Sequence, residues 1–511
     1  MPRTSRLLAA VLAAAALAAC SVSPVEGTFA DGPAATPSGS TATGQARWEP
    51  CADVVEEITG GRGNTRFRYS CATVRVPQDW AHPERGTFDL ALLRARATDQ
   101  DRRVGSMLVN PGGPGASGVE LAVYLTYGLP AEVTRRVDIV GFDPRGVGRS
   151  TEVACIPDRT KDALAAADPD PVGAAEFRAQ LGLWRGAADG CGRRYGARLG
   201  LFNTEQTARD LDALRAAVGD PKTTYLGYSY GTLLGAVYAR LFPRRIRALV
   251  LDGAVDPTAG PVESSRGQAA GFERAFDDFA AACRQRGSAC PIGPDARAAV
   301  NRVLAAVRAR PPRGSDGRAV TTGYVMTAIV SSLYSQSQWT ALGRAIADVE
   351  KGDGDRVLAL ADEYNQRRKD GTYGNLIDAN TAITCADEAT PPTVSEVRRL
   401  QGEWRTRYPL FGAPLATSLL TCAVWPSTRD PYPTGPARGA PPILVVGTTG
   451  DPATPYENTP KLASMLGTGI VLTWQGEGHT AYPQTACVSR AVDAYLLELK
   501  VPAAGLSCPA R

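Results

Sequence analysis

The chain has 511 residues, of which 44% are hydrophobic and 21% charged, an ordinary globular composition. Lys and Arg barely outnumber Asp and Glu, 56 against 52, and no segment is rich in Lys or Arg. Nothing in the sequence therefore supports nucleic-acid binding. The length is enough for one large core with an insertion, or for several domains.

Residues 1–19 have the pattern of a secretory signal, in which a basic start precedes an apolar run (7–19) too short to span a bilayer. The run ends in LAAC (17–20), which resembles the lipobox of bacterial lipoproteins, where the Cys is lipidated and becomes the first residue. We therefore expect several acyl chains on Cys20, enough for durable anchoring. The alternative is plain cleavage after an A-x-A-like site.

Residues 20–46 are rich in Gly, Pro, Ser, Thr and Ala, so we expect a flexible tether rather than a core. The two segments predict an exported protein, either a cell-membrane lipoprotein on the outer face or a secreted one. We expect membrane contact only through the lipid on Cys20. We also expect a monomer that uses no cofactor.

Cysteine usage favours export as well. Ten of the 11 Cys remain after Cys20, and an even number in an exported chain indicates disulfides. A zinc site is a poor rival, because the chain has no C-x-x-C and only two His, so we expect no metal. We expect sequential pairs, since each closes a modest loop: Cys51–Cys71, Cys155–Cys191, Cys283–Cys290, Cys385–Cys422 and Cys487–Cys508.

The segment 47–257 alternates short apolar strands with helices. A helix is predicted over 207–219, where apolar residues have helical spacing, and another follows the strand and turn of TTYLGYSYG. This alternation predicts a mostly parallel sheet with helices on both faces. Further strands or strand-and-loop units are expected at 88–98, 105–115, 137–150 and 246–257.

Helical patterns then dominate 258–430, with few buried strands. Strand and loop resume at 441–455, one more strand follows at 469–482, and a last helix closes the chain. We therefore expect one α/β domain, built from 47–257 and 431–511, that a helical insertion interrupts.

The stretch GYSYG (227–231) has the form G-x-S-x-G of a nucleophile elbow. Gly227 and Gly231 would allow close approach of the neighbouring backbone, and the helix that follows would direct its N-terminal dipole at a developing oxyanion. The pattern alone is common in loops. Its place between a buried strand and a helix favours Ser229 as a nucleophile.

A serine nucleophile needs a base, and the chain offers only His82 and His479. His82 precedes Pro83 in an expected exposed loop. The α/β-hydrolase order is Ser, acid, His, and only His479 follows Ser229. Asp451 follows a buried strand between them, at the carboxyl end where open α/β sheets place functional groups. We expect it to orient the imidazole.

An oxyanion hole requires two backbone N–H groups. The residue after the nucleophile, Tyr230, supplies one. The loop NPGGPG (110–115) follows an early strand, and its Pro residues have no N–H, so we choose Gly113 for the other. A plain tight turn is the alternative for this loop.

Five motifs together resemble the secreted tripeptidyl aminopeptidase family of α/β-hydrolases, which is related to the proline iminopeptidases. They are NPGGPGASG, GFDPRGVGRS, GYSYGT, GTTGDPATP and GEGHT, in that order, and the similarity runs from about residue 50 to the C-terminus. The resemblance implies serine exopeptidases that release short peptides, often tripeptides, from free N-termini. It also implies Ser229, Asp451 and His479 as the triad, with Gly113 and Tyr230 as oxyanion donors.

The resemblance further implies an α/β-hydrolase fold whose helical insertion, 258–430, is a lid placed before the strand that carries the catalytic Asp. An aminopeptidase must recognise an ammonium group, and a buried cation needs a carboxylate partner. Acids of the lid are the natural candidates: Asp387 and Glu388 beside Cys385, or Glu273 and Asp277 on a helix. Solvated helix acids are the alternative reading of all four.

Two other functions stay open. An esterase or lipase would use the same triad, because fold and motifs do not fix the pocket. A catalytically silent envelope binding protein is the third hypothesis, which the presence of every triad member disfavours.

Overall fold

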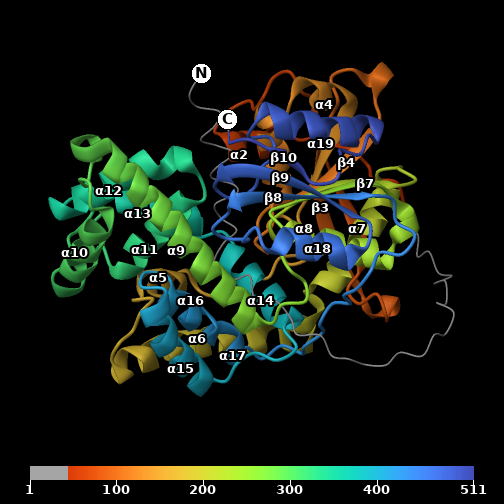
Figure 1. The fold of residues 1–511 in the computed structure, drawn as a ribbon. Coiled ribbons are helices and arrows are strands. Elements are labelled where there is room, and N and C mark those ends of the chain that lie inside the picture. The colour runs from red at the N-terminus through yellow and green to blue at the C-terminus, as the bar shows by residue number, and fades with distance from the viewer. Residues whose placement is uncertain (1–43, 511) are drawn as a thin grey trace.

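The computed structural model describes residues 44–510 (Figure 1). The expected signal (1–19), Cys20 and all of the tether except 44–46 lie outside these residues. Between residues 44 and 510, none of the helices combines the length and the apolar character that crossing a bilayer requires.

One ten-stranded sheet forms the centre of the protein, in the order β1-β2-β3-β5-β4-β6-β7-β8-β9-β10. The pairs β1–β2, β2–β3 and β3–β5 are antiparallel, and all other neighbours are parallel. This is the mostly parallel sheet of the α/β-hydrolase fold, as predicted. The strands are β1 (Glu49–Pro50), β2 (Tyr69–Pro77), β3 (Thr87–Ala95), β4 (Gly105–Asn110), β5 (Val137–Phe142), β6 (Thr223–Tyr228), β7 (Ile246–Asp252), β8 (Ile443–Gly450), β9 (Gly469–Glu477) and β10 (Leu506–Cys508).

Helices cover both faces of the sheet, and each face has its own apolar core. The central strands β5 and β6 are buried along their whole length, as parallel strands between two helical layers must be. One face is covered by α2 (Ala52–Thr59), α3 (Gly118–Gly128), α4 (Ala131–Arg136) and α19 (Ala486–Glu498). The other is covered by α7 (Thr204–Ala217), α8 (Tyr230–Leu241) and α18 (Asn458–Leu466).

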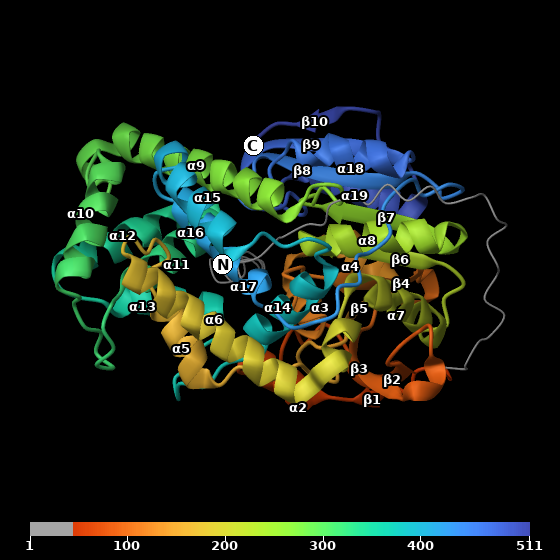
Figure 2. The ribbon, with the colours of Figure 1, turned by 90° about the horizontal axis from the view of Figure 1, so that it is seen from below.

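The helical insertion lies beside the carboxyl ends of the strands and has a separate core around Phe272, Phe276 and Phe279 (Figures 1 and 2). It leaves the sheet after β7 and returns at β8. Its helices are α9 (Pro261–Arg286), α10 (Ala296–Ala309), α11 (Thr322–Leu333), α12 (Trp339–Glu350), α13 (Asp355–Asn365), α14 (Leu376–Asp387), α15 (Val394–Arg407), α16 (Gly412–Ser418) and α17 (Leu420–Ala423).

Two earlier helices join this helical layer. α5 (Asp158–Ala166) and α6 (Ala174–Tyr195) come between β5 and β6 in sequence, within the segment that our boundaries assign to the core. They lie beside the insertion in Figure 2, and Phe177 of α6 belongs to an apolar cluster with Trp404 of α15. The helical layer at the carboxyl ends of the strands is therefore built from two parts of the chain, α5–α6 and α9–α17.

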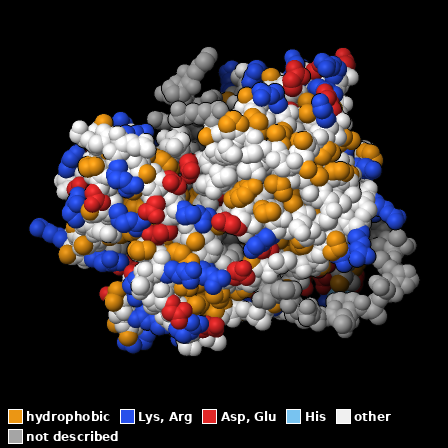
Figure 3. Space-filling view, viewed as in Figure 1, with side chains coloured by type: hydrophobic (Ala, Val, Ile, Leu, Met, Phe, Trp, Pro, Cys, Tyr) orange, Lys and Arg blue, Asp and Glu red, His pale blue; other side chains and the backbone are white. Residues whose placement is uncertain are grey.

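All five predicted disulfides are present, with the predicted sequential pairing. Two of them, Cys283–Cys290 and Cys385–Cys422, lie within the insertion. On the surface, positive and negative side chains are interspersed over the insertion on the face that Figure 3 shows, in keeping with the small net charge.

Candidate active site

Ser229 occupies a sharp turn between β6 and α8. Its backbone has φ 55° and ψ −124°, a conformation that non-glycine residues adopt only when the surroundings hold it. A Cβ on Gly227 would press into the Gly231 carbonyl, and one on Gly231 would lie 2.9 Å from the Asn110 carbonyl oxygen. The two glycines thus permit the close packing that a nucleophile elbow needs.

Asp451 and His479 form a buried pair at the carboxyl ends of β8 and β9. The His479 Nδ1 lies 2.9 Å from each carboxylate oxygen of Asp451. The carboxylate also accepts from the Ala453 N–H at 2.9 Å, and from the Thr454 N–H at 2.8 Å and hydroxyl at 3.0 Å. Because the pair places a proton on Nδ1, the neutral imidazole presents Nε2 as an acceptor.

The end of β7 lies between the turn at Ser229, here called the serine turn, and the segment after β9 that carries His479, here called the histidine loop. The Asp252 carbonyl accepts the Ser229 N–H at 2.9 Å. Its side chain accepts from the Ala481 N–H at 3.0 Å and the Tyr482 N–H at 2.7 Å. A Cβ on Gly253 would be 3.2 Å from the His479 Cε1. Ser229 therefore contacts Asp252, and His479 lies against the next residue, Gly253.

Burial raises the pKa of the Asp252 carboxyl to about 7, against the lowering effect of its backbone donors. The His479 Nε2 is buried and makes no hydrogen bond with any residue in 44–510, so Ser229 and His479 are not joined by one in this structure. Such contacts often tighten only when substrate binds.

The loop 110–115, here called the glycine loop, lies against the serine turn. Gly112 has φ 102°, and a Cβ there would be 2.8 Å from the Ser229 Cβ and 3.1 Å from the Tyr230 nitrogen. The Gly112 N–H is occupied by the Asn110 side-chain oxygen at 3.0 Å. The N–H groups of Gly113 and Tyr230 donate to no acceptor within the described part of the chain. Both remain available to an oxyanion beside Ser229.

The insertion contacts both of these loops. The Tyr334 carbonyl accepts the His479 N–H at 2.9 Å. The Asn380 side chain on α14 donates to the Pro114 carbonyl at 2.9 Å. A Cβ on Gly115 would lie 2.9 Å from the Asn380 nitrogen. The helical layer therefore supports the histidine loop and the glycine loop at once.

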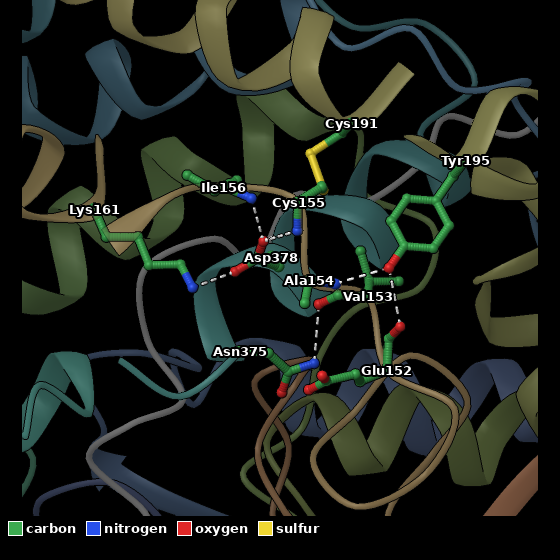
Figure 4. The surroundings of a disulfide bond; sticks show 10 residues. All are labelled: Glu152, Val153, Ala154, Cys155, Ile156, Lys161, Cys191, Tyr195, Asn375 and Asp378. Atoms are coloured by element: carbon green, nitrogen blue, oxygen red, sulfur yellow. Dashed lines mark hydrogen bonds and ion pairs between the residues drawn. A yellow bond between two sulfur atoms is a disulfide. The ribbon is translucent and has the colours of Figure 1, made fainter. Parts of the chain in front are cut away.

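Helix α14 is itself fixed near the Cys155–Cys191 disulfide (Figure 4). Asp378 accepts the N–H groups of Cys155 and Ile156 at 2.7 Å each and pairs with the Lys161 Nζ at 2.7 Å. These contacts hold the start of α14 against the segment that leads into α5, and so fix the helix that touches the glycine loop.

The predicted ammonium acids already have partners. Both carboxylate oxygens of Asp387 accept from Thr204, whose hydroxyl lies 2.6 Å from the Tyr230 hydroxyl. Glu388 is buried. Burial lowers the pKa of the Arg429 guanidinium, and the charge of Glu388 opposes this shift.

The helix acids share one cation. Glu273 accepts from Arg297 at 2.6 Å and from the Leu410 N–H at 3.1 Å, and Asp277 accepts from Arg297 at 2.7 Å. Two cavities lie near the glycine loop, one lined by Gly115 and the other by the α14 residues that contact this loop, and none of the four predicted acids lines either of them.

One of these cavities is polar and has a volume of about 620 Å³. Gly115 and Ser117 line it, as does Glu120 on the first turn of α3. The Glu120 carboxylate makes no hydrogen bond or ion pair with any other residue in 44–510. Burial, and then the charge of Asp143, raises its pKa to about 7, against the opposing effect of Arg149.

Several side chains around the candidate triad were not foreseen from the sequence. Thr454 follows Asp451 by three residues, and Asp252 is the last residue of the apolar strand β7, so both had a local signal. Glu120 follows the end of the glycine loop by five positions in the sequence. Tyr334 had no signal, because its contact with His479 joins segments far apart in the chain.

A serine at a strand-to-helix turn and a buried Asp–His pair, on an α/β-hydrolase fold, define a serine hydrolase. The chain belongs to the TAP-like family: residues 408–508 match the model of the TAP-like protein, and relatives align along nearly the whole chain.

Three relatives show the range of activities. Serine protease Hip1 of Mycobacterium tuberculosis is 38% identical over 90% of both chains. Carboxylesterase B of the same species is 37% identical over 93% of this chain and 92% of its own. Tripeptidyl aminopeptidase of Streptomyces lividans is 31% identical over 90% of this chain and 86% of its own. Their names include both peptidase and esterase.

Proposed function

We propose that the protein is an exported serine exopeptidase that releases short peptides, tripeptides above all, from free N-termini. The observation that carries this proposal is the grouping, at the carboxyl ends of the strands, of Ser229, the Asp451–His479 pair and two backbone N–H groups that have no acceptor among residues 44–510. The similarity to a tripeptidyl aminopeptidase supports the substrate class.

In this proposal Ser229 attacks the peptide carbonyl while the His479 Nε2 takes the hydroxyl proton. The N–H groups of Gly113 and Tyr230 stabilise the oxyanion. His479 then gives its proton to the leaving amine, and the acyl-enzyme forms. A water molecule, deprotonated by the same imidazole, releases the peptide. Asp451 keeps the ring oriented and stabilises its charged form.

For the substrate ammonium we propose Glu120 rather than the four lid acids. Its carboxylate faces the polar cavity beside the glycine loop and has no protein partner among residues 44–510, whereas Asp387 and Glu273 each have two donors. A substrate ammonium would supply the missing partner.

The second candidate function is a carboxylesterase. The same triad would serve it, and the relative named carboxylesterase B is 37% identical to this chain, against 38% for the relative named serine protease. An ester substrate needs no ammonium partner. A requirement for a free N-terminus on the substrate therefore distinguishes the peptidase from the esterase.

The test is hydrolysis of matched chromogenic substrates: mono-, di- and tripeptidyl amides, each free and N-acetylated, and a short-chain acyl ester. Turnover of the free tripeptidyl amide, lost on acetylation and in Ser229→Ala, is the expected result. The matched control is Ser337→Ala, an exposed serine of the insertion, which should behave as wild type. Ester turnover alone would refute the peptidase and leave the esterase.

Export is part of the proposal. Five disulfides are typical of proteins from oxidising compartments. We propose that lipid on Cys20 holds the protein at the outer face of the cell membrane. Cys20→Ala should move it from the membrane fraction to the medium; retention in the membrane fraction would refute the anchor.

A further inference from the structure

An apolar cavity of about 200 Å³ lies within the helical layer, bordered by α5, α6, α9, α11, α13, α14, α16 and α17. Among residues 44–510, no charged side chain lines it. An apolar cavity of roughly 150 Å³ in another protein stays dry and binds benzene, so this one has room for a ring or a branched aliphatic side chain. Its walls include Trp184, Phe272, Met326, Val330, Phe411 and Leu415.

One wall leads to the histidine loop. The ring of Phe272 lies 5.9 Å, centroid to centroid, from that of Tyr334. The Tyr334 ring lies 5.1 Å from the His479 imidazole, at 90° to it. Only one aromatic ring therefore separates the cavity wall from the proposed base.

Another wall leads to the glycine loop. Leu376 and Asn380 of α14 line the cavity. Asn380 also donates to the Pro114 carbonyl, and the Leu376 carbonyl oxygen is 3.0 Å from where a Gly115 Cβ would lie. Helix α14 thus lies between the cavity and the loop whose Gly113 N–H we assign to the substrate carbonyl.

We propose that this cavity is the subsite for the residue whose carbonyl Ser229 attacks, and that it takes a large, uncharged, apolar side chain. The inference rests on the proposed function. A substrate residue with its carbonyl at the Gly113 and Tyr230 amides would lie beside the glycine loop, which α14 contacts through Asn380 and Leu376. An apolar side chain gains free energy by leaving water for this cavity, whereas a carboxylate or ammonium would find no opposite charge among the lining residues.

The preference should be measurable in kcat/KM. A difference of one methylene in an apolar pocket is worth about 10- to 200-fold, so Phe or Leu at this position should exceed Ala by at least about 10-fold. Asp and Lys at the same position should be poorer substrates than Ala, because no lining residue supplies an opposite charge to the buried group.

The experiment compares tripeptidyl amides that differ only in this residue (Phe, Leu, Ala, Asp, Lys) and N-acetyl amino-acid aryl esters with the same five side chains. Val330→Phe and Thr327→Phe each fill the cavity from partly buried positions of α11. Val172→Phe is the control, at an exposed valine that does not line the cavity. The rate of labelling by a small fluorophosphonate reports whether the triad is intact.

We expect both filling variants to lower kcat/KM for Phe substrates about 10-fold or more, with Ala substrates and fluorophosphonate labelling within about twofold of wild type and of Val172→Phe. Equal losses for Phe and Ala substrates, or no preference for Phe over Ala in wild type, would overturn the subsite. The two proposals fail separately. If the amides are cleaved at equal rates whatever the side chain, the subsite is refuted and the peptidase stands. If the esters show the side-chain preference but the amides are not cleaved, the peptidase is refuted and the subsite stands.

Discussion

The carbonyl oxygen of Tyr334 accepts the backbone N–H of His479 at 2.9 Å, and the tyrosine ring stands edge-on to the imidazole. Tyr334 follows α11 in the insertion, and His479 follows β9 of the sheet. The helical insertion therefore helps to position the proposed base.

We expect Tyr334→Ala to lower kcat by about 10- to 100-fold, because small misplacements of a catalytic group carry penalties of this size. Tyr334→Phe keeps the ring beside His479 and should stay within about twofold of wild type. Steady-state kinetics on the best substrate, with circular dichroism to verify folding, measure this. Equal activity of the Ala and Phe variants would show that the ring does not position the imidazole.

Gly112→Ala should abolish activity. The residue has φ 102°, and its Cβ would lie 2.7 Å from the Tyr228 carbonyl oxygen and 2.8 Å from the Ser229 Cβ, so the turn or the loop must shift. Gly267→Ala on α9 is the control, since its Cβ would meet nothing within 4 Å. Fluorophosphonate labelling should be lost in the first variant and normal in the second. Normal labelling of Gly112→Ala would contradict the close packing described for this loop.

Activity on free peptides should weaken below about pH 7 relative to activity on esters. Burial, Asp143 and Glu57 raise the pKa of Glu120 to about 7, and Arg149 and Arg368 oppose them. As the pH falls through this value the carboxyl becomes neutral and no longer pairs with the substrate ammonium. The ratio of kcat/KM for a free tripeptidyl amide to that for an acetylated ester should therefore drop between pH 8 and pH 6.

Glu120→Gln should have a ratio that is low at pH 8 and nearly independent of pH, because its side chain does not titrate. The ester alone serves as the internal control for titration of the triad. A wild-type ratio that stays flat from pH 8 to pH 6 would exclude Glu120 as the ammonium partner.

Stability should also depend on Asp387. Burial raises the pKa of its carboxyl to about 8, above the usual value of 3.8. The folded protein therefore holds this proton more tightly than the unfolded chain, and the stability that it contributes is lost as the pH rises from about 4 to about 8.

Asp387→Asn is neutral at every pH. Its amide oxygen can accept from the Thr204 N–H and its NH₂ can donate to the Thr204 hydroxyl, which then donates to the Tyr230 hydroxyl. Thermal unfolding from pH 5 to pH 8.5 should show a smaller decline in Tm for the variant than for wild type. Parallel declines would mean that Asp387 titrates in the folded protein as it does unfolded.

Much of the sheet could be read from the sequence, because the information is local. Buried parallel strands appear as short apolar runs, and the turn at Ser229 requires a glycine on each side. With only two histidines and a required chain order, His479 was the single candidate base. Sequential disulfides close modest loops, and all five predicted pairs are present.

The partners of the charged side chains were decided by the tertiary structure. No local pattern shows that Asp387 faces Thr204, that Glu273 faces Arg297, or that Glu120 has no protein partner in the described chain. The packing of α5 and α6 with the insertion, and the contact of Tyr334 with His479, were equally hidden. Periodicity records which face of an element is apolar. Which polar groups then meet depends on packing between separate elements, from 24 positions apart for Glu273 and Arg297 to 183 for Asp387 and Thr204, and only the folded chain brings these together.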